Sequence, residues 1–165
     1  MGKKSIKENK TIYQLHREAL NLTREAASNQ MDCISADRIE KIESQKSLPH
    51  PDEILTMAEC YKAPNLCNYF CSHECPIGQK TVPPIKMKDL SQIVLEMLAT
   101  LNILENDKNR FIEITADGAI DDSEIEDFVS IQEKLNRISM VANTLQLWVE
   151  QTIADGIIDK EKLRR

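Results

Sequence analysis

The sequence predicts an all-helical protein, and three observations carry that prediction. Aromatic residues make up only 4% of the 165 residues and glycine occurs four times, a composition that disfavours β-sheet. Apolar residues recur at spacings of three and four along much of the chain, as one face of a helix requires. Ser, Thr and Asp stand just before several of these segments, where their side chains cap helix N-termini.

Residues 11–31 predict two short helices. The side chains of Ile12, Leu15 and Ala19 have helical spacing, so a first helix is expected to begin shortly after residue 11. Thr23 then restarts the chain as the N-cap of a second helix that runs to about Met31.

A third helix is predicted to begin after Ser35, which is placed as its N-cap. Asp32 and Cys33 lie in the turn before it. Three isoleucines are expected to face inward from this helix: Ile34, Ile39 and Ile42. Four residues are expected to face outward: Ala36, Asp37, Arg38 and Lys41.

Three segments carry a family resemblance: 22–27 (LTREAA), 34–43 (ISADRIEKIE) and 46–49 (KSLP). They resemble the phage-repressor-like, Xre-type helix-turn-helix family of bacterial transcriptional regulators. In that family a short loop containing Lys and Pro leads from the recognition helix into two more helices, and residues 51–63 supply the next one here. The resemblance covers residues 11–64 and implies a five-helix DNA-binding domain. It departs from the family in the turn, where Asp32 and Cys33 replace the usual small residue.

The resemblance implies double-stranded DNA as the partner, with the third helix in the major groove. The residues expected near base edges or adjacent phosphates are Ser35, Ala36, Asp37, Arg38 and Lys41. Those expected to hold phosphates are Thr23, Arg24, Lys46 and Ser47. Arg38 is the best candidate for a bidentate contact to guanine, and Lys41 for a phosphate.

The charge distribution agrees with an N-terminal part that faces DNA and a more acidic remainder of the chain. Residues 1–50 contain nine Lys/Arg and seven Asp/Glu, whereas the whole chain has a net charge of -6. A solvated surface of ordinary composition would give the same small positive excess, so charge alone does not decide the function.

Four of the five cysteines fall within sixteen positions: Cys60, Cys67, Cys71 and Cys75. Because a cytoplasmic chain has little use for disulfides, a bound metal is the first hypothesis. A spacing of four puts the last three thiols on one face of a helix that Pro64 opens. They would hold zinc or an iron–sulfur cluster, with Cys60 or His73 as the fourth ligand.

Two other hypotheses remain open for these cysteines. The thiols could pack as small, soft side chains under the helix-turn-helix domain, since free Cys is among the most often buried residue types. They could also form a reversible disulfide switch. The isolated Cys33 is expected to be a small core residue rather than a redox sensor, because Arg38 is the sole nearby cation that would lower its pKa.

Residues 76–84 are predicted to separate two domains. This segment has three prolines and a glycine and is not expected to sustain a helix. The chain is therefore expected to comprise a flexible N-terminus (1–10), the helix-turn-helix domain (11–64), a Cys-rich helical junction with a linker (65–84), and a C-terminal helical domain (85–165).

Two long amphipathic helices are predicted in the C-terminal domain, at about 86–116 and 122–154. At about 1.5 Å per residue each would be about 45 Å long, and neither would be stable alone in water. They are expected to form an antiparallel hairpin, followed by a short terminal helix. If the apolar stripe of each helix is wider than its partner helix covers, the hairpin is expected to form a homodimer. The dimer would present two recognition helices to half-sites about one DNA turn apart. A self-contained bundle is the alternative.

A six-residue phrase joins the two long helices and then returns near the C-terminus. Residues 116–121 read ADGAID and residues 154–159 read ADGIID. Gly118 and Gly156 suit the left-handed residue that ends a helix, and Asp121 and Asp159 suit the N-cap of the next one. The phrase is interpreted as a helix stop followed by a helix start, because it supplies too few oxygen ligands for an EF-hand calcium loop.

No catalytic constellation is recognisable, so the chain is not expected to be an enzyme. It has no apolar run of about 20 residues and no apolar segment after its Lys-rich start, so a cytoplasmic protein without a membrane partner is expected. The sequence favours a sequence-specific DNA-binding transcriptional regulator. The alternative is a protein-interaction module on the same frame, with a structural metal site and the long helices as its binding surface. Asp37 and Glu40 favour that alternative, since carboxylates repel phosphates.

Overall fold

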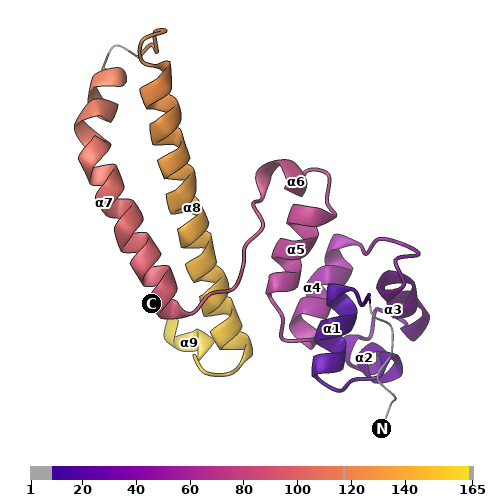
Figure 1. Cartoon of the computed structure of the whole chain (residues 1–165). Coiled ribbons are helices and arrows are strands. Elements are labelled where there is room, and N and C mark those ends of the chain that lie inside the picture. The colour runs from indigo at the N-terminus through magenta and orange to yellow at the C-terminus, as the bar shows by residue number, and fades with distance from the viewer. Residues whose placement is uncertain (1–8, 117, 164–165) are drawn as a thin grey trace. The chain divides into compact units, whose positions relative to one another are not determined.

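All regular structure is helical within residues 9–116 and 118–163, the part of the chain that this computed structural model describes (Figure 1). The prediction of an all-α protein is confirmed. The helices are α1 (Ile12–Ala19), α2 (Arg24–Met31), α3 (Ala36–Glu43), α4 (Pro51–Cys60), α5 (Asn65–His73), α6 (Gly78–Thr81), α7 (Leu90–Ile114), α8 (Ile125–Ala154) and α9 (Lys160–Leu163). Residues 1–8, most of the predicted flexible N-terminus, lie outside the described residues. None of the described helices has the length and apolar character needed to cross a membrane.

The chain divides into two compact units. One comprises the residues up to Pro84 together with those from Val149 onward, and the other is Ile85–Trp148. Within the first unit, we call the residues from α1 to α6, up to Pro84, the head. We call residues 85–148 the hairpin.

The first three helices of the head begin where their caps predict. The side-chain oxygens of Thr11, Thr23 and Ser35 each accept a hydrogen bond from the backbone N–H three residues later, at 3.3, 3.0 and 3.2 Å. Each helix starts at the residue after its cap. The caps predicted at Thr23 and Ser35 are therefore confirmed.

One apolar core fills the head, with side chains from α1 to α5. The three isoleucines predicted to face inward from α3 are each at most 2% exposed. From α5, Leu66 and Phe70 enter the same core at 0% and 8% exposure. Because these two side chains complete the core, α5 is the fifth helix of the head, although the sequence placed residues 65–73 in a junction.

A single helical turn, α6, lies in the segment that was predicted not to sustain a helix. That prediction was wrong because one turn needs few backbone hydrogen bonds and can be stabilised by packing. Gly78 is buried against the backbone of Cys71, so closely that an added Cβ would collide with the Cys71 carbonyl group. Glycine is the residue that permits this approach.

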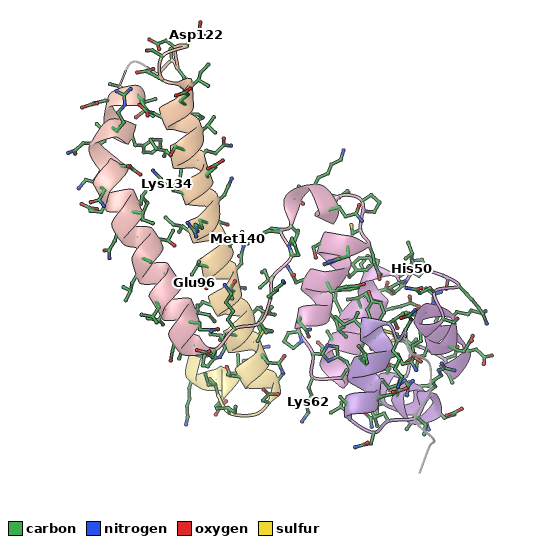
Figure 2. All side chains as sticks on the ribbon, viewed as in Figure 1. His50, Lys62, Glu96, Asp122, Lys134 and Met140 are labelled. Carbon is green, nitrogen blue, oxygen red and sulfur yellow. The ribbon has the colours of Figure 1, made fainter. Side chains whose placement is uncertain are left out.

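In the hairpin, α7 and α8 run side by side as the predicted antiparallel pair (Figure 1). Arg110 on α7 donates from Nε to a carboxylate oxygen of Asp127 on α8 at 2.6 Å. Lys134 on α8, which is labelled in Figure 2, forms an ion pair with Asp107 on α7. These pairs connect the two helices in the half of the hairpin that lies towards their joint.

The repeated six-residue phrase has two local features in common at its two places. Gly118 and Gly156 have φ of +74° and +75°, the left-handed region that favours glycine. Asp121 and Asp159 then each accept a hydrogen bond from the backbone N–H two residues later, at 2.7 and 3.0 Å. The helix stop is therefore confirmed in both places. The restart is confirmed directly after Asp159, where α9 begins at Lys160, whereas α8 begins at Ile125, four residues after Asp121. Asp117 lies outside the described residues.

The hairpin buries one stripe of α7 and exposes the stripe beside it. The buried or half-buried residues, spaced by three and four, are Ile93, Met97, Thr100, Leu104, Asp107, Phe111 and Ile114. One position further along lie Val94, Leu98, Leu101 and Ile112, which are 42%, 54%, 46% and 57% exposed. A two-helix hairpin thus leaves an apolar side face in water.

Candidate nucleic-acid interface

The helix-turn-helix consists of α2, the turn at residues 32–35 and α3. Asp32 ends α2 with φ of +51°, and Asp adopts positive φ more readily than most residues. The backbone N–H of Cys33 donates to the carbonyl group of Met31. The Cys33 side chain is exposed, with its thiol 3.8 Å from the hydroxyl of Thr56, so its prediction as a core residue was wrong. It was wrong because Asp32 takes the unusual conformation and the next side chain then points outward.

Glu43, the last residue of α3, connects the first three helices of the head. Its fully buried carboxylate accepts hydrogen bonds from Arg17 of α1 at 2.6 and 2.8 Å and from Arg24 of α2 at 2.8 Å. Burial disfavours the charged form of Arg17, but the hydrogen bonds to Glu43 leave the pKa of Arg17 raised. Two guanidinium groups on one carboxylate leave one net positive charge, and Arg24 is 36% exposed.

Arg38, the predicted guanine reader, is held by contacts within the head. Its Nε and Nη2 donate to the two carboxylate oxygens of Glu53 at 2.6 and 2.7 Å. Its Nη1 donates to the hydroxyl of Ser47 at 2.6 Å, and its Nη2 also donates to the carbonyl group of Leu48 at 2.9 Å. The hydrogen bond from Arg38 lowers the pKa of Glu53, and the same hydrogen bond to Glu53 raises the pKa of Arg38. Since all three nitrogens of this guanidinium already donate hydrogen bonds within the head, Arg38 fixes the loop between α3 and α4.

The sequence analysis missed both carboxylates that organise this surface, although each has a local signal. Glu43 lies four residues after Ile39, so it falls on the buried face of α3. Glu53 is the third residue of a helix that starts with Pro51, and it accepts the backbone N–H of His50 at 2.7 Å. A Glu at this position is the signature of a capping box. Neither signal reveals which arginine the carboxylate pairs with.

The nine predicted DNA contacts divide by exposure. Four are exposed: Ser35, Asp37, Lys41 and Lys46. Five are half-buried: Thr23, Arg24, Ala36, Arg38 and Ser47. The hydroxyls of Thr23 and Ser47 are already engaged, the first as a helix cap and the second by Arg38. The outward surface of α3 is therefore formed mainly by Ser35, Asp37 and Lys41.

Charges on this surface nearly cancel. Lys46 lies 3.1 Å from a carboxylate oxygen of Glu40, in a pair that is largely exposed. Among residues 9–116 and 118–163, no ion pair engages Lys41 or Asp37, so each is open to an outside partner. The surface offers hydrogen-bonding groups of both kinds rather than a basic patch.

The clustered cysteines line the edge of the head core. Cys67 and Cys71 lie one turn apart on α5, Cys60 ends α4, and Cys75 follows α5. All four are half-buried and pack against the core. Burial raises the pKa of Cys60 and, together with the nearby Cys71, that of Cys67. Half-buried thiols that pack against a core behave as small apolar side chains.

The zinc or iron–sulfur site expected at these cysteines stays a prediction. In the described part of the chain, no three Cys, His, Asp or Glu side chains are grouped so that they could hold a metal ion. His73, the alternative ligand, stacks on Tyr69 with ring centroids 4.5 Å apart. All four thiols lie at the edge of the apolar core, as the hypothesis of packed thiols expects.

No protein family, curated protein or solved structure matches this chain. The resemblance of residues 11–64 to Xre-type regulators therefore depends on the three sequence segments that carry it.

Proposed function

We propose that this chain is a sequence-specific DNA-binding transcriptional regulator whose head docks α3 in the major groove of double-stranded DNA. The observation that carries the proposal is the bracing of α3. Its inner face is held by buried isoleucines and by Glu43, while Ser35, Asp37 and Lys41 are exposed on its outer face. A helix that follows a tight turn and is braced from behind is the element that helix-turn-helix proteins insert into the groove.

Three exposed side chains of α3 suit direct contacts. The ammonium group of Lys41 can donate a hydrogen bond to guanine or to a phosphate. The carboxylate of Asp37 can accept a hydrogen bond from the amino group of cytosine. Ser35 stands at the N-terminus of α3, where backbone N–H groups favour a phosphate. A carboxylate on this surface is therefore compatible with DNA if it reads a cytosine.

Two cations support these contacts from the side. Arg24 belongs to the cluster with Glu43 that keeps one net positive charge, and it is partly exposed at the start of α2. Lys46 is paired with Glu40 in an exposed bridge, and breaking such a bridge to contact a phosphate costs about 1 kcal/mol or less.

Arg38 acts as a positioning residue in this proposal, and two variants test that role. Arg38→Ala and Glu53→Gln are titrated with a duplex enriched from a random-sequence library and with an unselected duplex. If Arg38 acts through Glu53, both variants weaken binding to the enriched duplex by a similar factor, and the double variant is no worse than either. Loss of discrimination in Arg38→Ala alone would show that Arg38 reads a base.

Salt dependence tests the proposal as a whole. Binding through several phosphates weakens steeply with salt, and the logarithm of the affinity falls linearly with the logarithm of the salt concentration. Lys41→Ala is expected to lower affinity for the enriched duplex by about tenfold, and Glu59→Ala on the exposed side of α4 serves as the control. If no duplex is enriched and binding is weak at low salt, the head is not a DNA-binding domain.

The regulator is proposed to act as a homodimer through the hairpin, with a second copy of the chain as the partner. The α7 stripe comprises Val94, Leu98, Leu101, Glu105, Lys108 and Ile112. If two α7 helices pack antiparallel about an axis between residues 106 and 107, Glu105 faces the other copy's Lys108, and Leu101 faces its Ile112. These four positions of the stripe are thus complementary to each other in charge and apolar character, and a two-fold dimer would supply one recognition helix for each half-site.

A protein-interaction module is the second candidate function. Asp37 and Glu40 on α3, and the engagement of Arg38 by Glu53, reduce the cationic character of this surface. A partner protein would bind it with a weak salt dependence, whereas DNA would bind with a steep one. The same titration therefore separates the two functions.

A further inference from the structure

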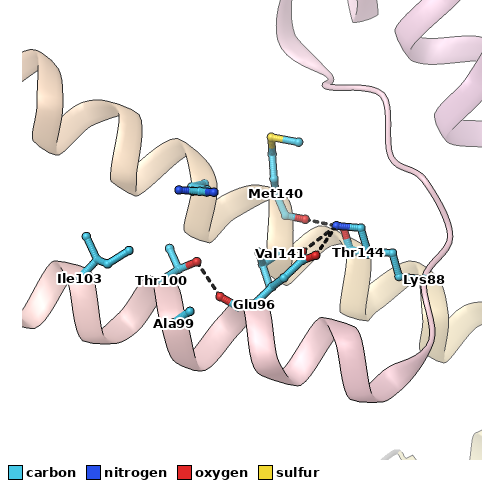
Figure 3. A pocket seen from close by; sticks show the side chains of 9 residues that line it. Lys88, Glu96, Ala99, Thr100, Ile103, Met140, Val141 and Thr144 are labelled. Carbon is cyan, nitrogen blue, oxygen red and sulfur yellow. Dashed lines mark hydrogen bonds and ion pairs between the residues drawn. The ribbon is translucent and has the colours of Figure 1, made fainter.

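A cavity of about 380 Å³ opens between α7 and α8 within the hairpin (Figure 3). Small-molecule sites in proteins have volumes of roughly 300–1,000 Å³. The cavity therefore has room for a small organic molecule.

One part of the cavity wall is apolar. Val141 and Thr100 form buried parts of it, at 7% and 5% exposure, and Ala99, Ile103 and Met140 extend it towards solvent (Figure 3). The hydroxyl of Thr100 donates to the carbonyl group of Glu96 at 2.6 Å, in its own helix. This hydroxyl is thereby satisfied, so the wall presents mainly methyl and methylene groups to an occupant.

Charged side chains complete the lining. Lys88, just before α7, donates to both carboxylate oxygens of Glu96 at 2.6 and 2.7 Å, so these two charges neutralise each other (Figure 3). Arg137 of α8 also lines the cavity. Within the described residues, no hydrogen bond or ion pair engages Arg137.

Arg137 differs from the other cations of α7 and α8. Lys108, Arg110 and Lys134 each form an ion pair with a carboxylate. Residues 85–148 contain six Lys/Arg and twelve Asp/Glu. Among the described residues of α7 and α8, Arg137 is therefore the one Lys or Arg without a carboxylate partner, and it lies beside the apolar cavity.

We propose that this cavity binds a small organic carboxylic acid with an apolar body. The carboxylate is held by the guanidinium of Arg137, whose parallel N–H groups match its two oxygens. The hydrocarbon part lies against Ile103, Met140 and Val141. An inorganic anion would leave the apolar wall in water, and a neutral apolar molecule would leave Arg137 without a partner.

Octanoate is the probe for the experiment, with octanamide and acetate as matched ligands that lack the charge or the apolar body. Binding to the full chain is measured by isothermal titration calorimetry, and the site is located by NMR shifts of the methyl groups of Ile103, Met140 and Val141. Octanoate is expected to bind saturably, and both matched ligands are expected to bind at least about tenfold more weakly.

Three variants test the assignment of the residues. Arg137→Gln removes the cation and is expected to weaken octanoate binding about tenfold while leaving octanamide unchanged. Ala99→Leu fills the cavity from an exposed helical position and is expected to weaken octanoate as well. Lys86→Gln, an exposed cation just before α7 that does not line the cavity, is the control and is expected to bind octanoate like the unmodified chain.

Several results would overturn the proposal. Equal binding of octanoate and octanamide would mean adsorption to the exposed apolar face of the hairpin. Unchanged octanoate affinity in Arg137→Gln, or the absence of saturable binding, would mean that the cavity is not a carboxylate site. The outcome does not depend on DNA binding, because no measurement contains DNA.

Discussion

The head and the hairpin are both built from amphipathic helices, but they bury their apolar side chains to different extents. The large side chains that are buried almost completely in the head are Ile34, Ile39, Ile54, Met57 and Leu66. In the hairpin they are Ile93 and Ile114. Five helices can surround a common core, whereas two helices can cover only one face of each other.

The ion pairs of the two regions differ in the same way. In the head, the Arg17–Glu43 pair has side-chain exposures of 7% and 0%. In the hairpin, Arg110 and Asp127 are 43% and 50% exposed. The comparison indicates that the head buries apolar side chains and ion pairs within itself, whereas the hairpin leaves more of both exposed to water.

The largest effect is expected from Glu43→Ala. This change leaves Arg17 buried without its carboxylate, which should cost about 3–5 kcal/mol of head stability. Urea unfolding followed by circular dichroism measures the loss. Glu40→Ala is the control, because its bridge to Lys46 is exposed and should contribute about 1 kcal/mol or less. Equal losses in the two variants would mean that the head does not depend on its buried pair.

The second effect concerns association of the hairpin. Leu98→Glu places a charge in the α7 stripe and should weaken self-association at least about tenfold in sedimentation equilibrium. Leu95→Glu is a matched control, since Leu95 is more exposed, at 66% against 54%, but lies outside the stripe. A chain that is monomeric without substitution, or that responds equally to both changes, would show that the hairpin is stable without a second copy.

A smaller effect is expected at the cysteines on the edge of the head core. Replacing half-buried Cys67 by Ser introduces a more polar group and should cost about 1 kcal/mol, whereas a zinc chelator should leave the urea midpoint unchanged. Elemental analysis of the purified, reduced protein should find less than one zinc or iron per chain. Stoichiometric metal, together with unfolding by the chelator, would restore the hypothesis of a metal site.

The smallest effect is a pH dependence of the head. The hydrogen bond from Arg38 holds the pKa of Glu53 below its ordinary value of 4.5, so the folded state binds this proton less readily than the unfolded state. The stability from this pair is present above pH 4.5 and is lost as pH falls through the lowered pKa. Glu53→Gln should therefore lower stability by about 1 kcal/mol at pH 7 and by much less near pH 3. A constant difference across this range would show that Glu53 acts only through packing.

The sequence by itself determined the helical class, several helix caps and the inward face of α3. Thr23 and Ser35 cap helices, the isoleucines of α3 face inward, and the two glycines of the repeated phrase have positive φ. These features depend on residues within four positions of each other, so the order of residues is sufficient to predict them.

The tertiary structure decided which charged side chains pair within the protein and which remain available to a binding partner. It paired Arg38 with Glu53, fifteen positions away, and Glu43 with Arg17, twenty-six positions away. It also packed the predicted helix of cysteines into the core as the fifth helix of the head, and stabilised one turn of helix at Gly78 by close packing. The partner of a long charged side chain depends on which helices meet in space, and local sequence patterns do not contain that information.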